Sequence, residues 1–159
     1  MGAAANLVTE PADRVLKIER VFDAPRSLVF KAWTESEHMA RWWGPRGFKS
    51  EVLKNELRPG GSYRIHMRGP DGTVYPMTGV FQEVVEPERL VSTSAALDEK
   101  GDPLFEVLNT VTFAEQGGKT KLTLHARVTK TTAKAARYLA GMEQGWSQSL
   151  DRLAEEVES

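Results

Sequence analysis

The chain has 159 residues, of which 40% are apolar and 27% are charged, so it is long enough to bury one core and resembles a soluble globular protein in composition. The net charge of −1 and the absence of a basic cluster argue against nucleic-acid binding. The absence of cysteine excludes disulfides, thiolate metal sites and a cysteine nucleophile. Because the sequence shows neither a signal-peptide pattern nor a membrane-spanning apolar run, we expect a cytoplasmic protein without membrane contact.

The N-terminal part predicts a tail, a strand and a helix. Residues 1–14 are small and polar, so we expect a flexible tail, followed by a single domain over residues 15–159. Apolar and polar residues alternate over 15–22, which is typical of a half-buried strand. Asp23 is then expected to cap a short helix, with Pro25 near its first position.

A second short helix is predicted directly after the first. Thr34 and Glu37 have the spacing of a capping box at its start. The helix carries Met39 and Trp42 and ends at Gly44–Pro45. Because Trp42 is followed by a second tryptophan, we expect one indole to be buried and the other to be partly exposed, either as a lid on the sheet edge or as a partner contact.

From residue 48 onward the hydrophobic period falls to two. This pattern predicts strands over residues 48–57, 62–68, 73–85, 90–97, 104–114 and 120–129. Short turns rich in glycine and proline join them, so the sheet is expected to be antiparallel.

The C-terminal stretch 131–158 predicts a long amphipathic helix, capped by Thr131 or Thr132. Its apolar stripe consists of Ala135, Leu139, Met142, Trp146, Leu150, Leu153 and Val157. Gly141 and Gly145 lie beside this stripe and leave room, either for a ligand or for a closely packed strand. The helix is expected to cover the apolar face of the sheet in a two-layer α+β fold.

Five short motifs in order resemble a known family. They are residues 18–25, the Trp42–Trp43–Gly44–Pro45 run, residues 57–61, residues 86–90, and the stretch 145–153. Together they resemble the bacterial family similar to the C-terminal domain of the activator of the heat-shock protein 90 ATPase, in the START-like, Bet v 1-like superfamily. The resemblance implies the helix-grip fold, in which a curved seven-stranded antiparallel sheet surrounds a long C-terminal helix and two short helices follow the first strand.

Known catalytic and cofactor motifs are not found. The three histidines lack metal-ligand spacing, and there is no nucleophile elbow, phosphate loop or dinucleotide fingerprint, so no metal or cofactor is expected. An enzyme of the cyclase or dehydratase type needs a buried acid–base pair, for which only Glu143 and His66 are available. We therefore favour a protein that is not an enzyme.

An apolar interior with few polar groups is typical of a small-molecule pocket, although such residues are also typical of an ordinary core. Asn109 is unusual because it lies on the apolar face of its strand, where it can orient a ligand or bond to neighbouring backbone. The candidate ligand-binding residues are Trp33, Trp42, Tyr63, Ile65, Met67, Met77, Phe105, Val107, Asn109, Tyr138, Met142 and Trp146.

Two functional hypotheses remain besides an enzyme. The leading one is a binding protein for a hydrophobic or aromatic small molecule, held between the sheet and the C-terminal helix. The alternative, supported by the resemblance alone, is a chaperone-type partner that activates a heat-shock ATPase in the stress response. Either would act as a monomer or a homodimer.

Overall fold

The computed structural model describes residues 15–133 and 140–158. The predicted tail over residues 1–14 lies outside the described residues, as do Ala135, Tyr138 and Leu139 of the predicted C-terminal helix. In the described part, none of the helices is long and apolar enough to cross a membrane.

The fold is α+β, with one seven-stranded antiparallel sheet in the order β1-β7-β6-β5-β4-β3-β2. The strands are β1 (Val15–Phe22), β2 (Lys49–Asn55), β3 (Ser62–Arg68), β4 (Val74–Val85), β5 (Arg89–Leu97), β6 (Pro103–Gln116) and β7 (Lys119–Thr131). The first and third of these match the predicted bounds, and the others differ by a few residues at their ends. The helix-grip fold implied by the family resemblance is thus confirmed.

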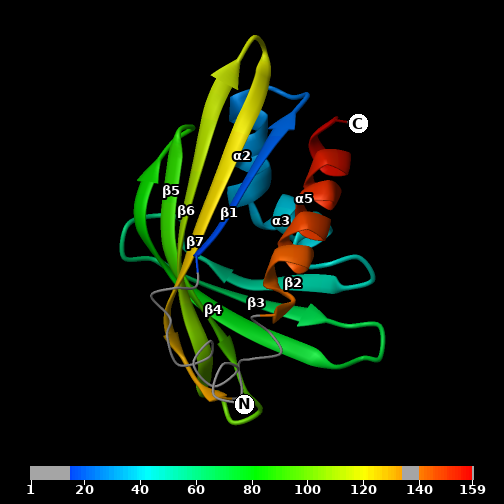
Figure 1. The fold of residues 1–159 in the computed structure, drawn as a ribbon, viewed down its shortest axis with the longest axis vertical. Coiled ribbons are helices and arrows are strands. Elements are labelled where there is room, and N and C mark those ends of the chain that lie inside the picture. The colour runs from blue at the N-terminus through cyan, green and yellow to red at the C-terminus, as the bar shows by residue number, and fades with distance from the viewer. Residues whose placement is uncertain (1–14, 134–139, 159) are drawn as a thin grey trace.

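The sheet bends around the C-terminal helix α5 (Met142–Glu158), as Figure 1 shows. Irregularities in strand register contribute to this bend, because an extra residue in one strand of a pair increases the local twist. They lie between Val52 and Lys54, Phe81 and Glu83, Ala96 and Leu97, and Glu106 and Val107.

Two short helices, α2 (Arg26–Thr34) and α3 (Ser36–Trp42), follow β1 as predicted, but the predicted caps were wrong. Pro25 occupies the N-cap of α2, so Asp23 lies too far upstream to cap it. Glu35 is the N-cap of α3, and the hydroxyl of Thr34 instead donates to the carbonyl of Phe30, one turn back in α2. Thr34 is the last residue of α2, so it cannot begin a capping box for α3.

The predicted start of the C-terminal helix was also wrong. Thr131 is the last residue of β7 and pairs with Phe105 of β6. The hydroxyl of Thr132 donates to the carbonyl of Leu104 rather than to a helix terminus. Pairing with β6 therefore extends β7 as far as Thr131, and α5 begins at Met142, after a turn at Gly141.

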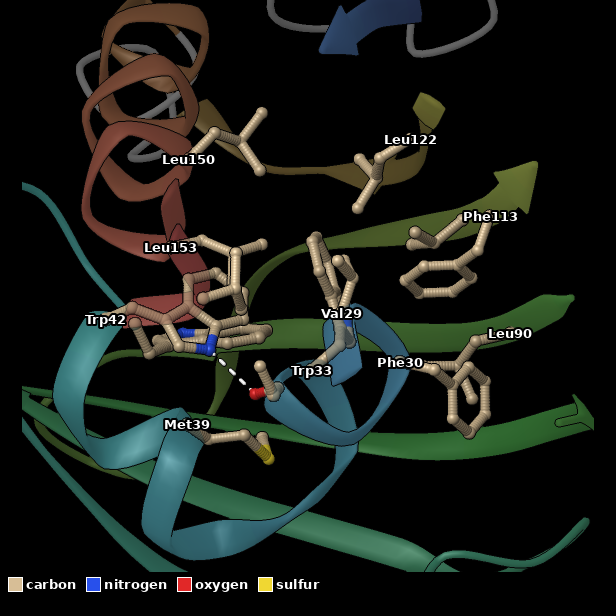
Figure 2. Packing of buried hydrophobic residues seen from close by; sticks show 14 of the residues in the cluster. Val29, Phe30, Trp33, Met39, Trp42, Leu90, Phe113, Leu122, Leu150 and Leu153 are labelled. Atoms are coloured by element: carbon tan, nitrogen blue, oxygen red, sulfur yellow. Dashed lines mark hydrogen bonds between the residues drawn. The ribbon is translucent and has the colours of Figure 1, made fainter. Parts of the chain in front are cut away.

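The main core lies where α2, α3 and the last turns of α5 meet the concave face of the sheet (Figure 2). Leu150 and Leu153 of α5 are fully buried in the same cluster as Leu122 of β7. Burying a leucine side chain contributes about 1.5–3 kcal/mol, so this end of α5 is firmly anchored. The N-terminal end of the helix has fewer buried residues, and a cavity lies there.

Candidate ligand-binding cavity

A cavity of about 400 Å³ lies between the sheet, the loop after α3 and the first turns of α5. Mostly apolar residues from β3, β4, β5 and β6 form its floor, and residues of α5 and of the loop form the opposite wall. The residues that line it are Trp43, Gly44, Pro45, Phe48, Met67, Tyr75, Pro76, Met77, Ser94, Ala96, Phe105, Val107, Asn109, Gly141, Met142, Gly145, Trp146 and Ser149.

Two tryptophans form an aromatic corner of the cavity. The rings of Trp43, at the C-cap of α3, and Trp146, in α5, meet edge to face with centroids 5.6 Å apart. Trp146 also stacks on Trp33 of α2, with centroids 5.8 Å apart and an interplanar angle of 9°. The indole N–H of Trp43 donates to the sulfur of Met77 at 3.3 Å. These contacts hold both indoles in place before any ligand arrives.

Arg152 of α5 holds the loop that carries part of the cavity wall. Its Nη1 donates to the carbonyls of Gly44 at 2.9 Å and Pro45 at 3.1 Å, and its Nη2 donates to the carbonyl of Arg41 at 2.8 Å. Trp43 O lies 3.4 Å from the same Nη1. A planar guanidinium suits this task because its N–H groups fan out in fixed directions.

The space beside Gly145 is open. A Cβ at Gly145 would meet only Pro45 Cγ, at an ordinary contact distance of 3.7 Å. The predicted alternative of a closely packed strand is thus wrong at this position, and the glycine borders the cavity. Ser149, one turn later, is buried and donates its hydroxyl to the Gly145 carbonyl at 3.0 Å, which occupies its only proton.

The polar groups of the floor are Asn109 of β6 and Ser94 of β5. Asn109 is only 8% exposed, and its Nδ2 donates to Ser94 Oγ at 2.9 Å. Tyr63 lies behind them: burial raises the pKa of its phenol to about 12, and hydrogen bonding with Ser92 and Ser94 opposes that rise in part. The phenol therefore stays protonated at neutral pH.

Charged groups are missing from the cavity wall formed by the described residues. Glu143 is exposed on α5, and His66 points away from the concave face of β3. The described residues also contain no group of His, Asp or Glu side chains that could hold a metal ion. The acid–base pair that an enzyme would need here is therefore not assembled by these two side chains.

The structure separates the candidate residues into two groups. Those on the cavity wall are Met67, Met77, Phe105, Val107, Asn109, Met142 and Trp146. Trp33, Trp42, Tyr63 and Ile65 are instead packed in the core, away from the cavity. The indole N–H of Trp42 donates to the Ala32 carbonyl at 2.8 Å, because α2 and α3 fold over this end of the sheet. Tyr138 lies outside the described residues.

Several wall residues escaped the sequence analysis. Trp43 was considered only as a lid or partner contact, and one indole of the Trp42–Trp43 pair was expected to be partly exposed. This expectation was wrong, because both indoles are buried and Trp43 faces the cavity. Phe48 lies one residue before β2, and its ring meets that of Tyr75 at 5.8 Å between centroids. The adjacent tryptophans were a usable signal. Phe48 was predicted as the first residue of a strand over 48–57, but it lies in the loop before β2.

The fold and its cavity define a helix-grip α+β protein with an apolar cleft between the sheet and α5. The family described as "Activator of Hsp90 ATPase homolog 1-like protein" matches residues 23–158, and the chain belongs to this family. The predicted family is thereby confirmed.

Several solved structures share this fold. Protein CV1439 from Chromobacterium violaceum is 28% identical, with a TM-score of 0.77 over 92% of this chain and 98% of the other. Protein Ms6760 from Mycobacterium smegmatis is 26% identical, with a TM-score of 0.77 over 89% of each chain. A protein from Arthrobacter aurescens shares the fold with a TM-score of 0.84 at 24% identity, over 94% and 89%. Among curated proteins, a search finds no match.

Proposed function

We propose that this protein binds a small hydrophobic or aromatic molecule in the cavity between the sheet and α5, with the cytoplasm as its location. One observation carries the proposal: a cavity of about 400 Å³ opens inside a fold whose other end is tightly packed. Its size lies within the range of about 300–1,000 Å³ that is usual for small-molecule sites. Aromatic and methionine side chains make up much of the wall and suit a flat apolar ligand.

Apolar burial is enough to drive such binding. At roughly 25 cal/mol per Å², covering about 250 Å² of ligand surface would contribute about 6 kcal/mol before the entropic cost of association. The tryptophan contacts reduce that cost because the corner formed by Trp43 and Trp146 is already ordered.

The test uses the neutral dye N-phenyl-1-naphthylamine, whose fluorescence rises in apolar surroundings, with the full chain. Ala96 lies on the cavity wall, so Ala96→Phe fills the space and is expected to lower dye affinity at least tenfold. Ala95→Phe is the matched control, because the adjacent residue of β5 points to the opposite face of the sheet. Equal binding by both variants and the wild type would contradict the proposal.

Family membership supports a second candidate, an activator of a chaperone ATPase. It makes a different prediction: the purified chain would raise the ATPase rate of a heat-shock protein 90, and Ala96→Phe would leave this effect unchanged. An absence of any rate effect would remove this candidate.

A further inference from the structure

One polar side chain in the cavity floor is left with an unused acceptor. The Asn109 residue is only 8% exposed, and it lies on the cavity wall together with Ser94. Its Nδ2 donates to Ser94 Oγ at 2.9 Å. Among the described residues, its Oδ1 has no side-chain hydrogen-bond partner. Among the described residues, the buried side-chain polar atoms without a partner are Asn55 Oδ1 and His66 Nε2, so the Asn109 oxygen is still reached by solvent from the cavity and is free to accept a hydrogen bond from a ligand.

The surrounding hydrogen bonds fix the direction in which this amide points. The phenol of Tyr63 donates to the carbonyl of Thr93, with 3.4 Å between the oxygens, so its own oxygen is left to accept. The Ser94 oxygen accepts a hydrogen bond from Nδ2 of Asn109 at 2.9 Å. Because Nδ2 is engaged with Ser94, Oδ1 is the polar atom of the amide that is left to bind a ligand.

We propose that the ligand is an uncharged aromatic molecule with one hydroxyl or N–H group, which donates a hydrogen bond to Oδ1 of Asn109. This inference rests on the proposed function and names its ligand class. The absence of charged side chains from the described wall favours an uncharged ligand, because burying an unpaired charge is very costly. The Trp43–Trp146 corner and the ring of Phe105 favour a flat ring system.

The geometry also predicts how the site discriminates between ligands. A ligand without a donor would seal the Asn109 oxygen away from water with no partner, whereas a donor would satisfy it. Sites built to bond a polar group reject analogues that lack it far more strongly than apolar pockets reject an extra methyl. Burial alone predicts the opposite order, because the analogue without the donor is the more hydrophobic compound.

The experiment compares 1-naphthol with 1-methylnaphthalene, which have similar shape and differ in the donor. Binding to the full chain is followed by tryptophan fluorescence, since Trp43 and Trp146 line the cavity. The wild type is expected to bind 1-naphthol about tenfold more tightly, which corresponds to one hydrogen bond of about 1.4 kcal/mol. Asn109→Leu should abolish or reverse this preference by weakening 1-naphthol alone.

Two further variants keep the test decisive. Thr110→Val removes a hydroxyl from the next residue of β6, on the opposite face, and should leave the preference intact. Ser94→Ala removes the partner that orients the amide and should reduce the preference even if Asn109→Leu fails to fold.

The inference is overturned if the wild type shows no preference for 1-naphthol, if a folded Asn109→Leu retains it, or if neither compound binds. Dye binding that Ala96→Phe blocks would leave the proposed function standing in each of these cases. If the dye does not bind, or if Ala96→Phe binds it as tightly as the wild type, the proposed function itself is contradicted.

Discussion

Nη1 of Arg152 lies 2.9 Å from the carbonyl oxygen of Gly44 and donates a hydrogen bond to it. This contact joins the best-anchored part of α5 to the loop that closes the cavity, across more than a hundred residues of sequence. Gly44 itself has φ of 100°, and a Cβ there would come within 3.2 Å of the sulfur of Met67, a wall residue. Arg152 is therefore a positioning residue for the cavity, although it does not line it.

Replacing Arg152 with methionine should destabilise the protein and loosen the cavity wall. The carbonyls of Arg41, Gly44 and Pro45 would lose a charged donor, and hydrogen bonds to charged groups contribute about 1.5–3 kcal/mol each when measured singly. Because the site is partly solvated, we expect a total loss of about 2–4 kcal/mol in urea unfolding. Dye affinity should fall as well.

Arg152→Lys is the control for charge. Lysine keeps the positive charge but cannot reproduce the fork of donors, so it should recover less than half of the lost stability. Full recovery would show that the charge alone holds the loop.

Two glycines on the cavity wall should respond to alanine with opposite signs. Gly145→Ala should raise the free energy of unfolding by about 0.5–1 kcal/mol, because alanine favours helix and the added Cβ has space. Gly44→Ala should lower it by about 1–2 kcal/mol, because φ of 100° is unfavourable for an L side chain. Urea unfolding of both variants checks the signs, and a destabilised Gly145→Ala would mean that the space beside α5 is filled.

Gly79 of β4 should not tolerate even alanine. A Cβ there would overlap the ring of Tyr63 and the carbonyl oxygen of Thr93, and the latter belongs to the backbone of β5 and cannot move freely. We expect a loss of about 3 kcal/mol in the free energy of unfolding. A variant as stable as the wild type would refute this account.

The contact of Glu156 with α3 should make stability depend on pH. Burial raises the pKa of this carboxyl, but hydrogen bonds from Arg41 at 2.8 Å and His38 at 2.6 Å outweigh it, so the net pKa lies below its ordinary value of 4.5. A pKa lowered by folding contributes stability above 4.5, and this contribution is lost as the pH falls through the folded value.

Glu156→Gln is expected to lower stability at neutral pH and to approach the wild type as the pH falls from about 5 to 3. Urea midpoints across that range measure the effect. Glu99→Gln, at an exposed position in the turn between β5 and β6, is the control for the loss of one carboxylate elsewhere on the surface. A constant gap between Glu156→Gln and the wild type at every pH would rule out the titration of this carboxylate as the cause.

The strands and their inward faces were predictable because both signals are local. Alternation places Met67, Asn109 and Val107 on the concave face, since side chains on a strand point to opposite sides in turn. Glycine and proline in the turns limit where each strand can end. The start of α5 was not predictable in this way, because Thr131 has the chemistry of a helix cap and only its pairing with Phe105 keeps it in β7.

The sequence by itself therefore determined the order of the elements, the family and the face of the sheet on which Met67, Val107 and Asn109 lie. Only the tertiary structure decided which of those side chains border empty space. Tyr63 and Met67 share one face of β3, yet Tyr63 is packed against Phe81 and Met67 lines the cavity. The difference arises from what lies above each residue, and that depends on how α2, α3 and α5 cross the sheet. Strand periodicity records the face of a side chain but not how completely another element covers it.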